Sequence, residues 1–422
     1  MIIKTACHKG RLVLKFTPEQ GDPVSHHKFS NSYKKSKKVS MTSMQCEIHL
    51  PSDWTITSVH PDLFALAMLA TIYPFAGKTI RLPFGISQYF HDQVFKITKK
   101  KILPIDKKLS RRKATTNAVP ALTFSGGIDS TAAVALLPDK THLLYFDRIV
   151  PKGTKTLLNQ EAAYYACKQM KKLGKAVHNI KTDLQYLRKP VGFSTFLTDA
   201  VPALLLADYH GYDALANGQT LDLGYRIGHL GYEDCRETEL AKPWHPLLQA
   251  VDMPYTLPTI GLSEVVTTNI VRQSPYGEFA QACSRGKIKK PCMNCYKCFR
   301  KSLLEKVMTN SPINDKYLDE LFQIKDVKRV LATKHLHYGN VITYITSHYH
   351  GKHPEMLALK KKTRGDRLDV SWMNKWYPDA EEFLAPKYRN EVKKRIFKYV
   401  KPMNQKDIQT MKKSFSKEYF QK

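Results

Sequence analysis

The sequence predicts an α/β protein built on an open, mostly parallel β-sheet. Short apolar segments at residues 120–124, 142–146, 176–180 and 213–217 have the length and composition of buried strands. Longer segments with helical periodicity separate them. Strands joined by helices of that length pair in parallel through right-handed crossovers, and ligands bind beyond the carboxyl ends of such strands.

The helices between these strands follow from the same pattern. A helix is expected to begin at residue 130 and to include residues 130–137, shortly after the first strand. Residues 157–173 form an amphipathic pattern that ends at Gly174, and residues 197–209 form a more apolar helical pattern. The segment 118–310 therefore holds the predicted α/β core.

The N-terminal flank is expected to contribute strands and loops. Residues 4–16 and residues 48–59 each have the composition of a strand. The basic, serine-rich stretch between them, residues 30–43, is predicted to be a mobile loop. Residues 99–117 are rich in Lys and Arg and poor in apolar side chains, which indicates a linker.

The chain of 422 residues is longer than one hydrophobic core usually fills, so several domains are expected. We predict an N-terminal basic α+β region (1–117), the central domain (118–310) and a C-terminal basic, mostly helical region (311–422). Trp372 and Trp376 stand one helical turn apart in the last region, which favours helix packing over base stacking.

Charge is concentrated in the two flanks. The net charge is +30, of which residues 1–120 carry +13 and residues 311–422 carry +11. Such a field favours a nucleic acid or an acidic protein surface as partner. The apolar run 63–72 is far shorter than the roughly 20 residues of a bilayer crossing and indicates a buried helix. No signal-peptide pattern opens the sequence, so no membrane association and a cytoplasmic location are expected.

The sharpest motif is Ser-Gly-Gly-Ile-Asp-Ser at residues 125–130, placed between the first core strand and its helix. Two glycines allow a tight turn with exposed N–H groups, and the helix start favours an anion. The motif should occur by chance in fewer than roughly one in a thousand chains of this length. It therefore predicts a phosphate-binding loop in which Ser125 and Ser130 donate hydrogen bonds and Asp129 holds Mg²⁺. A turn that uses glycine for its shape alone is the plainer interpretation.

Four of the eight cysteines fall within 16 residues, at Cys283, Cys292, Cys295 and Cys298. Four thiolates without a histidine are typical of a closed tetrahedral zinc site that fixes a loop. An iron–sulfur cluster accepts the same ligands and stays open as an alternative.

Together the two motifs resemble the PP-loop ATP pyrophosphatases, and within them 7-cyano-7-deazaguanine synthase of the queuosine pathway. The spacing of the four cysteines is that of this family, and Gly-Tyr-Glu-Asp-Cys-Arg at 231–236 is similar to its Gly-Tyr-Pro-Asp-Cys-Arg segment. The resemblance covers about residues 118–305. Arg148 and Ile149 after the second strand, and the segment near Thr195 and Phe196, depart from the family, which indicates a modified substrate or partner.

The resemblance implies a Rossmann-like core of the adenine nucleotide alpha hydrolase type that binds ATP, Mg²⁺ and Zn²⁺. It implies adenylation of a small carboxylate of deazapurine type, release of pyrophosphate and AMP, and formation of an amide and then a nitrile with ammonia. Ser125, Asp129 and Ser130 would be catalytic. Asp222 is equally well explained as a loop-capping carboxylate. The implied ATP-binding residues are Phe124, Ser125, Gly126, Gly127, Ile128, Asp129, Ser130, Phe146, Gly218 and Asp222.

Three hypotheses about function follow. The first is this ligase, including a form diverged into a defence or modification gene set. The second is a PP-loop enzyme that modifies tRNA or another RNA, because such enzymes exist and the flanks are basic. The third is a non-catalytic ATP- and zinc-binding scaffold that docks a partner protein, against which the intact residues Ser125, Asp129 and Ser130 argue.

Overall fold

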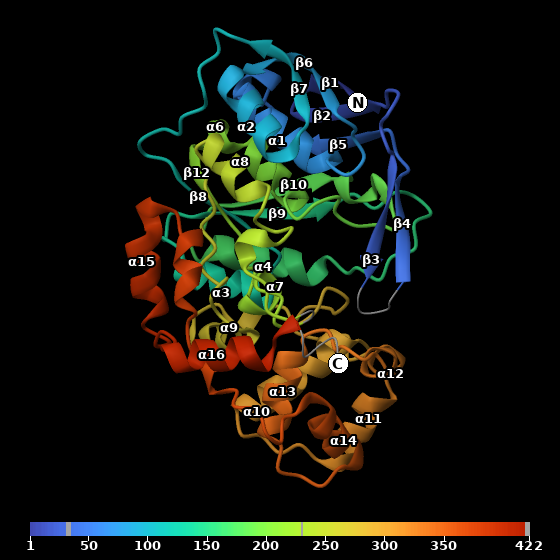
Figure 1. Cartoon of the computed structure of the whole chain (residues 1–422), viewed down its shortest axis with the longest axis vertical. Coiled ribbons are helices and arrows are strands. Elements are labelled where there is room, and N and C mark those ends of the chain that lie inside the picture. Colours follow the sequence, from blue (N-terminus) through green and yellow to red (C-terminus); the bar gives the residue numbers. More distant parts are fainter. Residues whose placement is uncertain (31–34, 229–230, 418–422) are drawn as a thin grey trace.

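The computed structural model describes residues 1–30, 35–228 and 231–417 (Figure 1). Within these ranges, nine strands form one large sheet. In chain order they are β1 (Ile2–His8), β2 (Arg11–Thr17), β5 (Gln45–His49), β6 (Thr79–Ser87), β7 (Lys101–Asp106), β8 (Val119–Thr123), β9 (His142–Arg148), β10 (Val177–Thr182) and β12 (Tyr212–Ala216). Their order across the sheet is β12-β8-β9-β10-β5-β2-β1-β6-β7.

The predicted α/β class with a mostly parallel sheet is confirmed. The strands β12, β8, β9 and β10 are all parallel neighbours, with Ala121 of β8 opposite His142 of β9 and Leu143 of β9 opposite Val177 of β10. Each strand lies within two residues of its predicted position. Burial on both faces of β8 explains why its sequence is continuously apolar.

The N-terminal flank continues the same sheet. Strand β5 pairs antiparallel with β10, with Ile48 opposite Thr182, so the sheet passes from the core into the flank without a break. The prediction of one strand over residues 4–16 is wrong, because the chain turns back at Lys9 and Gly10 to form the hairpin of β1 and β2. Gly10 has φ +72°, and a Cβ there would lie 2.1 Å from the carbonyl oxygen of Pro51.

Three further expectations in this flank are corrected. The strand expected over 48–59 ends at His49. The chain turns at Pro51 and then forms a short 3₁₀ turn, so it is no longer extended. Residues 30–43 were expected to be a mobile loop, but Ser25–Ser30 (β3) and Lys35–Met41 (β4) pair antiparallel in a second, three-stranded sheet with Arg188–Lys189 (β11). Residues 31–34 of that stretch lie outside the described residues. The linker predicted over 99–117 contains β7, which pairs in parallel with β6.

Helices cover both faces of the large sheet (Figure 1). The apolar run 63–72 lies in a helix that is buried on every side except at Pro61, as predicted. The helix predicted over 157–173 begins only at residue 161, and the one over 197–209 breaks at Leu206 into two short helices. The helices of the first half are α1 (Pro61–Ile72), α2 (Gln88–Thr98), α3 (Ile128–Leu136), α4 (Glu161–Lys172), α5 (Val201–Leu205), α6 (Ala207–His210) and α7 (Leu221–Gly224).

The second half is mostly helical, as expected for residues 311–422. Its helices are α8 (Trp244–Ala250), α9 (Glu264–Gln273), α10 (Tyr296–Met308), α11 (Asp315–Gln323), α12 (Lys325–Leu331), α13 (Gly339–Ser347), α14 (Pro354–Thr363), α15 (Pro386–Ile396) and α16 (Gln405–Ser414). Trp372 lies in a 3₁₀ turn and Trp376 lies beyond it, so they do not share a helix, but both are buried in the packing.

The core is divided by the sheet into two layers of apolar side chains. Leu143 belongs to a cluster that includes side chains of α3, α4 and α15, and Leu144 belongs to a second cluster that includes side chains of α1 and α5. Helices α10 to α14 gather at the end of the molecule away from β1 and β6 (Figure 1). None of the helices in the described ranges combines the length and apolarity that a bilayer crossing needs.

Candidate functional site

The predicted phosphate loop lies where the parallel strand β8 ends and α3 begins. Gly126 has φ +72°, a conformation that glycine adopts without strain. The two serine hydroxyls at the ends of the motif face each other, with 3.1 Å between the Oγ atoms of Ser125 and Ser130. The amide of Gly127 donates to Ser125 Oγ over 3.3 Å. The loop is therefore a compact turn that brings both hydroxyls to the start of the helix.

The start of α3 can accept an anion. No side chain caps this helix, whose N-cap residue is Gly127, whereas Ser263 caps α9 through its hydroxyl. Uncapped amides in a first turn carry the positive end of the helix dipole. Gly218, which follows β12, packs against the same turn, because a Cβ there would lie 2.6 Å from the amide nitrogen of Ser130. Both segments that the sequence assigned to phosphate thus meet at one point.

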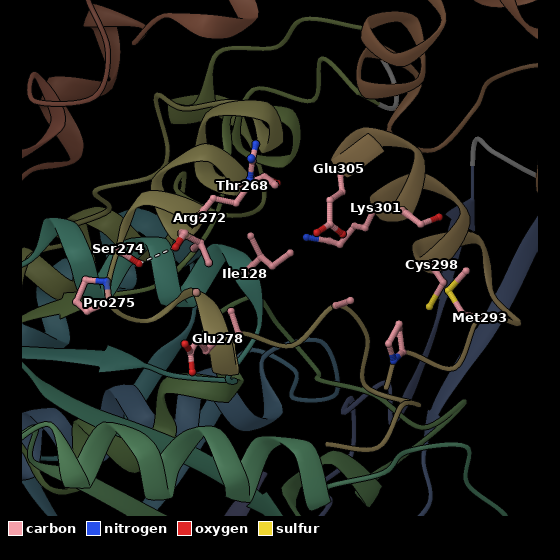
Figure 2. A pocket seen from close by; sticks show the side chains of 16 residues that line it. Ile128, Thr268, Arg272, Ser274, Pro275, Glu278, Met293, Cys298, Lys301 and Glu305 are labelled. Carbon is pink, nitrogen blue, oxygen red and sulfur yellow. Dashed lines mark hydrogen bonds between the residues drawn. The ribbon is translucent and has the colours of Figure 1, made fainter. Parts of the chain in front are cut away.

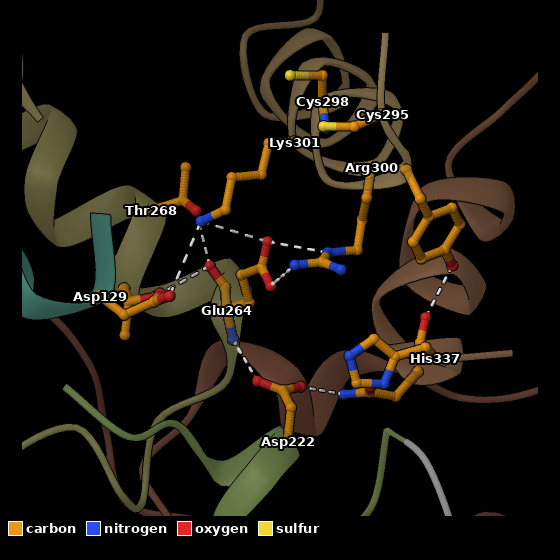
Figure 3. Close-up of polar contacts among 12 residues, drawn as sticks. Asp129, Asp222, Glu264, Thr268, Cys295, Cys298, Arg300, Lys301 and His337 are labelled. Atoms are coloured by element: carbon orange, nitrogen blue, oxygen red, sulfur yellow. Dashed lines mark hydrogen bonds and ion pairs between the residues drawn. The ribbon is translucent and has the colours of Figure 1, made fainter. Parts of the chain in front are cut away.

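Asp129 contacts residues that arrive from two other helices (Figure 3). Its Oδ1 accepts a hydrogen bond of 2.8 Å from Thr267 of α9, and its Oδ2 lies 3.9 Å from Nζ of Lys301 on α10. Lys301 Nζ also lies 3.5 Å from Oε1 of Glu264. The lysine side chain is only 4% exposed, yet its ammonium group has no hydrogen-bond partner within the described residues. The ammonium group of Lys301 is therefore buried and held only by ion pairs, and its side chain borders the space beside the loop.

Glu264 anchors this group of charges. Its carboxylate accepts hydrogen bonds of 3.1 and 2.8 Å from Nε and Nη2 of Arg300, a paired geometry. Burial by itself raises the pKa of Glu264, but the neighbouring charges of Arg300 and Lys301 outweigh burial and hold that pKa at about 2. The glutamate is therefore ionised at neutral pH, and it orients two cations that lie next to each other on α10.

The four cysteines come together as predicted. Their Sγ atoms all lie within 4.8 Å of one another, and those of Cys292 and Cys298 are 3.7 Å apart. A tetrahedral ion with Zn–S bonds of about 2.3 Å separates its sulfurs by roughly 3.8 Å. Backbone amides of Cys292 and Cys298 point at the sulfurs of Cys283 and Cys295, which supports thiolates. The group can therefore bind a metal ion such as zinc.

The cysteine group and the phosphate loop are linked by the chain itself. The amide of Gln281, two residues before Cys283, donates to the carbonyl oxygen of Gly126 over 2.7 Å. Cys295 is the N-cap of α10, and the same helix carries Lys301 one turn after Cys298, with Arg300 next to it. A metal bound by the cysteines would fix both the segment that contacts the loop through Gln281 and the helix that delivers the lysine.

Asp222, Phe124 and Phe146 make their contacts outside the loop. Asp222 is buried, and its carboxylate accepts from the amide of Glu264 over 2.8 Å and from Asn340 Nδ2, while burial raises its pKa to about 6. Those contacts are what a capping carboxylate makes. Phe124 is buried in the core, and Phe146, at the carboxyl end of β9, packs edge-on against Phe193 with 5.1 Å between the ring centroids.

Two cavities open on either side of the pair formed by Asp129 and Lys301. One of about 640 Å³ lies between α3, α9 and the cysteine segment (Figure 2) and is bordered by Ile128 and Lys301. The other, of about 500 Å³, is bordered by Asp129 and the residues of α10 and α12. Its lining includes basic and aromatic side chains: Tyr296, Lys297, Arg300, Arg329, His335, His337 and Tyr338. Both volumes fall in the range of small-molecule sites.

Residues 243–414 match the model of a family described as a family of unknown function (DUF6395). The match covers α8 to α16, hence the second helix that borders the loop, the cysteine group and the C-terminal helices, but not the loop itself. Comparison with curated proteins and with solved structures returned no match. The comparisons thus relate residues 243–414, less than half of the chain, to this family and assign no activity.

Three members of the site were missed in the sequence. Thr267, Glu264 and Lys301 lie far from the motif along the chain, and no local pattern marks them as partners of Asp129. The spacing of Lys301, one turn after Cys298 on a helix, was the only available signal.

Proposed function

We propose that this protein is an ATP-dependent enzyme of PP-loop type that activates a small carboxylate by adenylation, as 7-cyano-7-deazaguanine synthase does. The observation that carries the proposal is the uncapped start of α3, which follows a glycine turn and faces the buried ammonium group of Lys301. Helix amides and a desolvated cation together form a strong site for phosphate oxygens. A turn built for its shape alone has no need of a buried, unbonded lysine.

The chemistry follows from the charges. A carboxylate oxygen of the substrate attacks the α-phosphorus of ATP, the bond to the bridging oxygen breaks, and pyrophosphate leaves with the negative charge. The amides of α3 and Lys301 would hold that leaving charge. Ammonia then attacks the activated carbonyl carbon and AMP leaves, which gives the amide. A second ATP would then adenylate the amide oxygen with release of pyrophosphate, and loss of AMP together with the two protons on nitrogen would give the nitrile.

The metals would have separate tasks. Asp129, whose side chain is partly exposed, would hold Mg²⁺, which would neutralise charge on the phosphates. The four cysteines would hold Zn²⁺, because the spacing of their sulfurs suits one ion better than a cluster in which each thiolate ligates a different iron. Because four thiolates fill all the coordination positions of a tetrahedral ion, such a zinc would fix structure and take no part in the reaction.

The basic cavity supports an anionic, planar substrate. Lys297 and Arg329 offer positive charge, and Tyr296 and Tyr338 offer aromatic surface on the side of Asp129 that faces α12. A carboxylate on a heterocyclic ring matches both properties. We assign this cavity to the acid and the region of Lys301 to the phosphates.

The direct test is release of AMP and pyrophosphate from ATP when heterocyclic carboxylates and ammonia are supplied to the full chain. We expect release that depends on the carboxylate and that is lost in Asp129→Asn. Asp139→Asn, an exposed aspartate shortly after α3, is the matched control and should behave as wild type. Absence of ATP binding would refute the proposal, and AMP release that requires RNA in place of a carboxylate would refute the substrate class.

A further inference from the structure

Three histidines that are distant in sequence meet near the amino ends of the central strands, whereas the phosphate loop lies at the carboxyl end of β8. His142 is the first residue of β9, His178 the second of β10 and His210 the last of α6. One ring nitrogen from each lies within 4.8 Å of the other two. Strand β9 spans seven residues, or roughly 20 Å, so this group is independent of the proposed ATP site.

The arrangement follows from the strand register. His178 stands opposite Leu144, and Leu144 is two residues from His142, so both histidines project from the same face of the sheet. The helix pair α5 and α6 covers that face and delivers His210 at its end. Tyr212 at the start of β12 adds its hydroxyl, 3.2 Å from Nδ1 of His142.

The distances suit coordination of one ion. Nδ1 of His142 lies 3.1 Å from Nε2 of His178, and two nitrogens bound at about 2.0 to 2.1 Å to a tetrahedral ion stand roughly 3.3 Å apart. The rings of His178 and His210 are also close, with 4.3 Å between centroids. A hydrogen bond explains one pair of nitrogens only. The third residue has a nitrogen left over, because Nε2 of His210 is buried without a hydrogen-bond partner within the described residues.

We propose that His142, His178 and His210 form a second metal site that binds a divalent transition-metal ion of the zinc class. Neutral imidazoles are favoured ligands for such ions, and three of them leave one position for water or another ligand. Each histidine is partly exposed, so the group lies close to the molecular surface. The site differs from the cysteine group in ligand type, which allows the two to be told apart.

The test is metal counting on the full chain, with Co²⁺ as the probe. We expect wild type to bind two equivalents and His178→Gln to bind one. His350→Gln, which changes an exposed histidine, should still bind two. One equivalent in wild type, or two in His178→Gln, would overturn the proposal.

A second measurement holds even if the histidine variant does not fold. In Cys295→Ser, which disables the cysteine group, bound Co²⁺ should show ligand-field bands without thiolate-to-metal charge transfer, as nitrogen ligands require. Addition of Zn²⁺ should remove those bands. If Cys295→Ser binds no Co²⁺, or if all bound Co²⁺ shows thiolate charge transfer, no histidine site exists.

Discussion

Replacement of Lys301 by methionine should separate stability from nucleotide binding. At an effective dielectric constant of about 20, ammonium and carboxylate groups 3.5 and 3.9 Å apart attract each other by about 4 to 5 kcal/mol. Removal from water costs several kcal/mol per ion, for the ammonium group and for the buried carboxylate of Glu264 alike, and no hydrogen bond to the ammonium group offsets that cost. The terms nearly cancel, and Glu264 keeps its paired hydrogen bonds to Arg300. We therefore expect Lys301→Met to change the free energy of unfolding by no more than about 1 kcal/mol while ATP turnover falls by about a hundredfold.

The matched variant is Arg300→Met, one residue away on the same helix. Loss of the paired guanidinium leaves the buried Glu264 with the lysine alone, so this change should destabilise the fold by about 3 to 5 kcal/mol. Urea unfolding gives the stabilities, and titration of a non-hydrolysable ATP analogue gives the affinities. If Lys301→Met is as unstable as Arg300→Met and binds the analogue like wild type, the lysine belongs to a structural ion pair and the assignment of phosphate to it is wrong.

Further changes test other parts of the site. Cys295→Ser should lower the zinc content measured by elemental analysis by one equivalent and lower nucleotide affinity, because α10 loses its anchor; unchanged affinity would disprove that link. Gly218→Ala should reduce affinity for the ATP analogue at least tenfold, since its Cβ would overlap the first turn of α3, whereas Gly339→Ala, whose Cβ has room, should not; equal affinities would mean that the two segments do not share the ligand. The pKa of Glu264 lies at about 2 in the folded chain and at an ordinary value of 4.5 when unfolded, so it contributes about 3 kcal/mol of stability above pH 4.5 that is lost as the pH falls towards 2. Urea unfolding of Glu264→Gln across that range should lack this slope, and a slope equal to that of wild type would contradict it.

Local patterns allowed the central strands, the glycine turn and the cysteine group to be predicted. Strand β8 and the turn at residues 125–130 lie next to each other in sequence, so their geometry is set by neighbouring residues. The cysteines are also close in sequence, from Cys283 to Cys298, and their spacing implies a common ligand. In each case the residues that cooperate are also neighbours along the chain.

What could not be predicted depends on contacts between distant segments. Lys301 meets Asp129 across 172 residues, and nothing local requires it. The histidine group depends on the register of β9 and β10. The spacing of His142 and His178 along the sequence therefore does not indicate a metal site. The composition of the polar stretch around β4 predicts a loop, because its strand conformation depends on its partners β3 and β11.

The pairing of β5 with β10 limits how the protein can be shortened. A fragment that begins at residue 118 would expose the hydrogen-bonding edge of β10 beside Ile180, which is buried in the intact chain. Bare strand edges next to apolar side chains recruit other chains, and aggregation follows. Experiments on the part of the chain that carries the glycine turn and the cysteine group therefore require the first 117 residues, because β5 covers that edge.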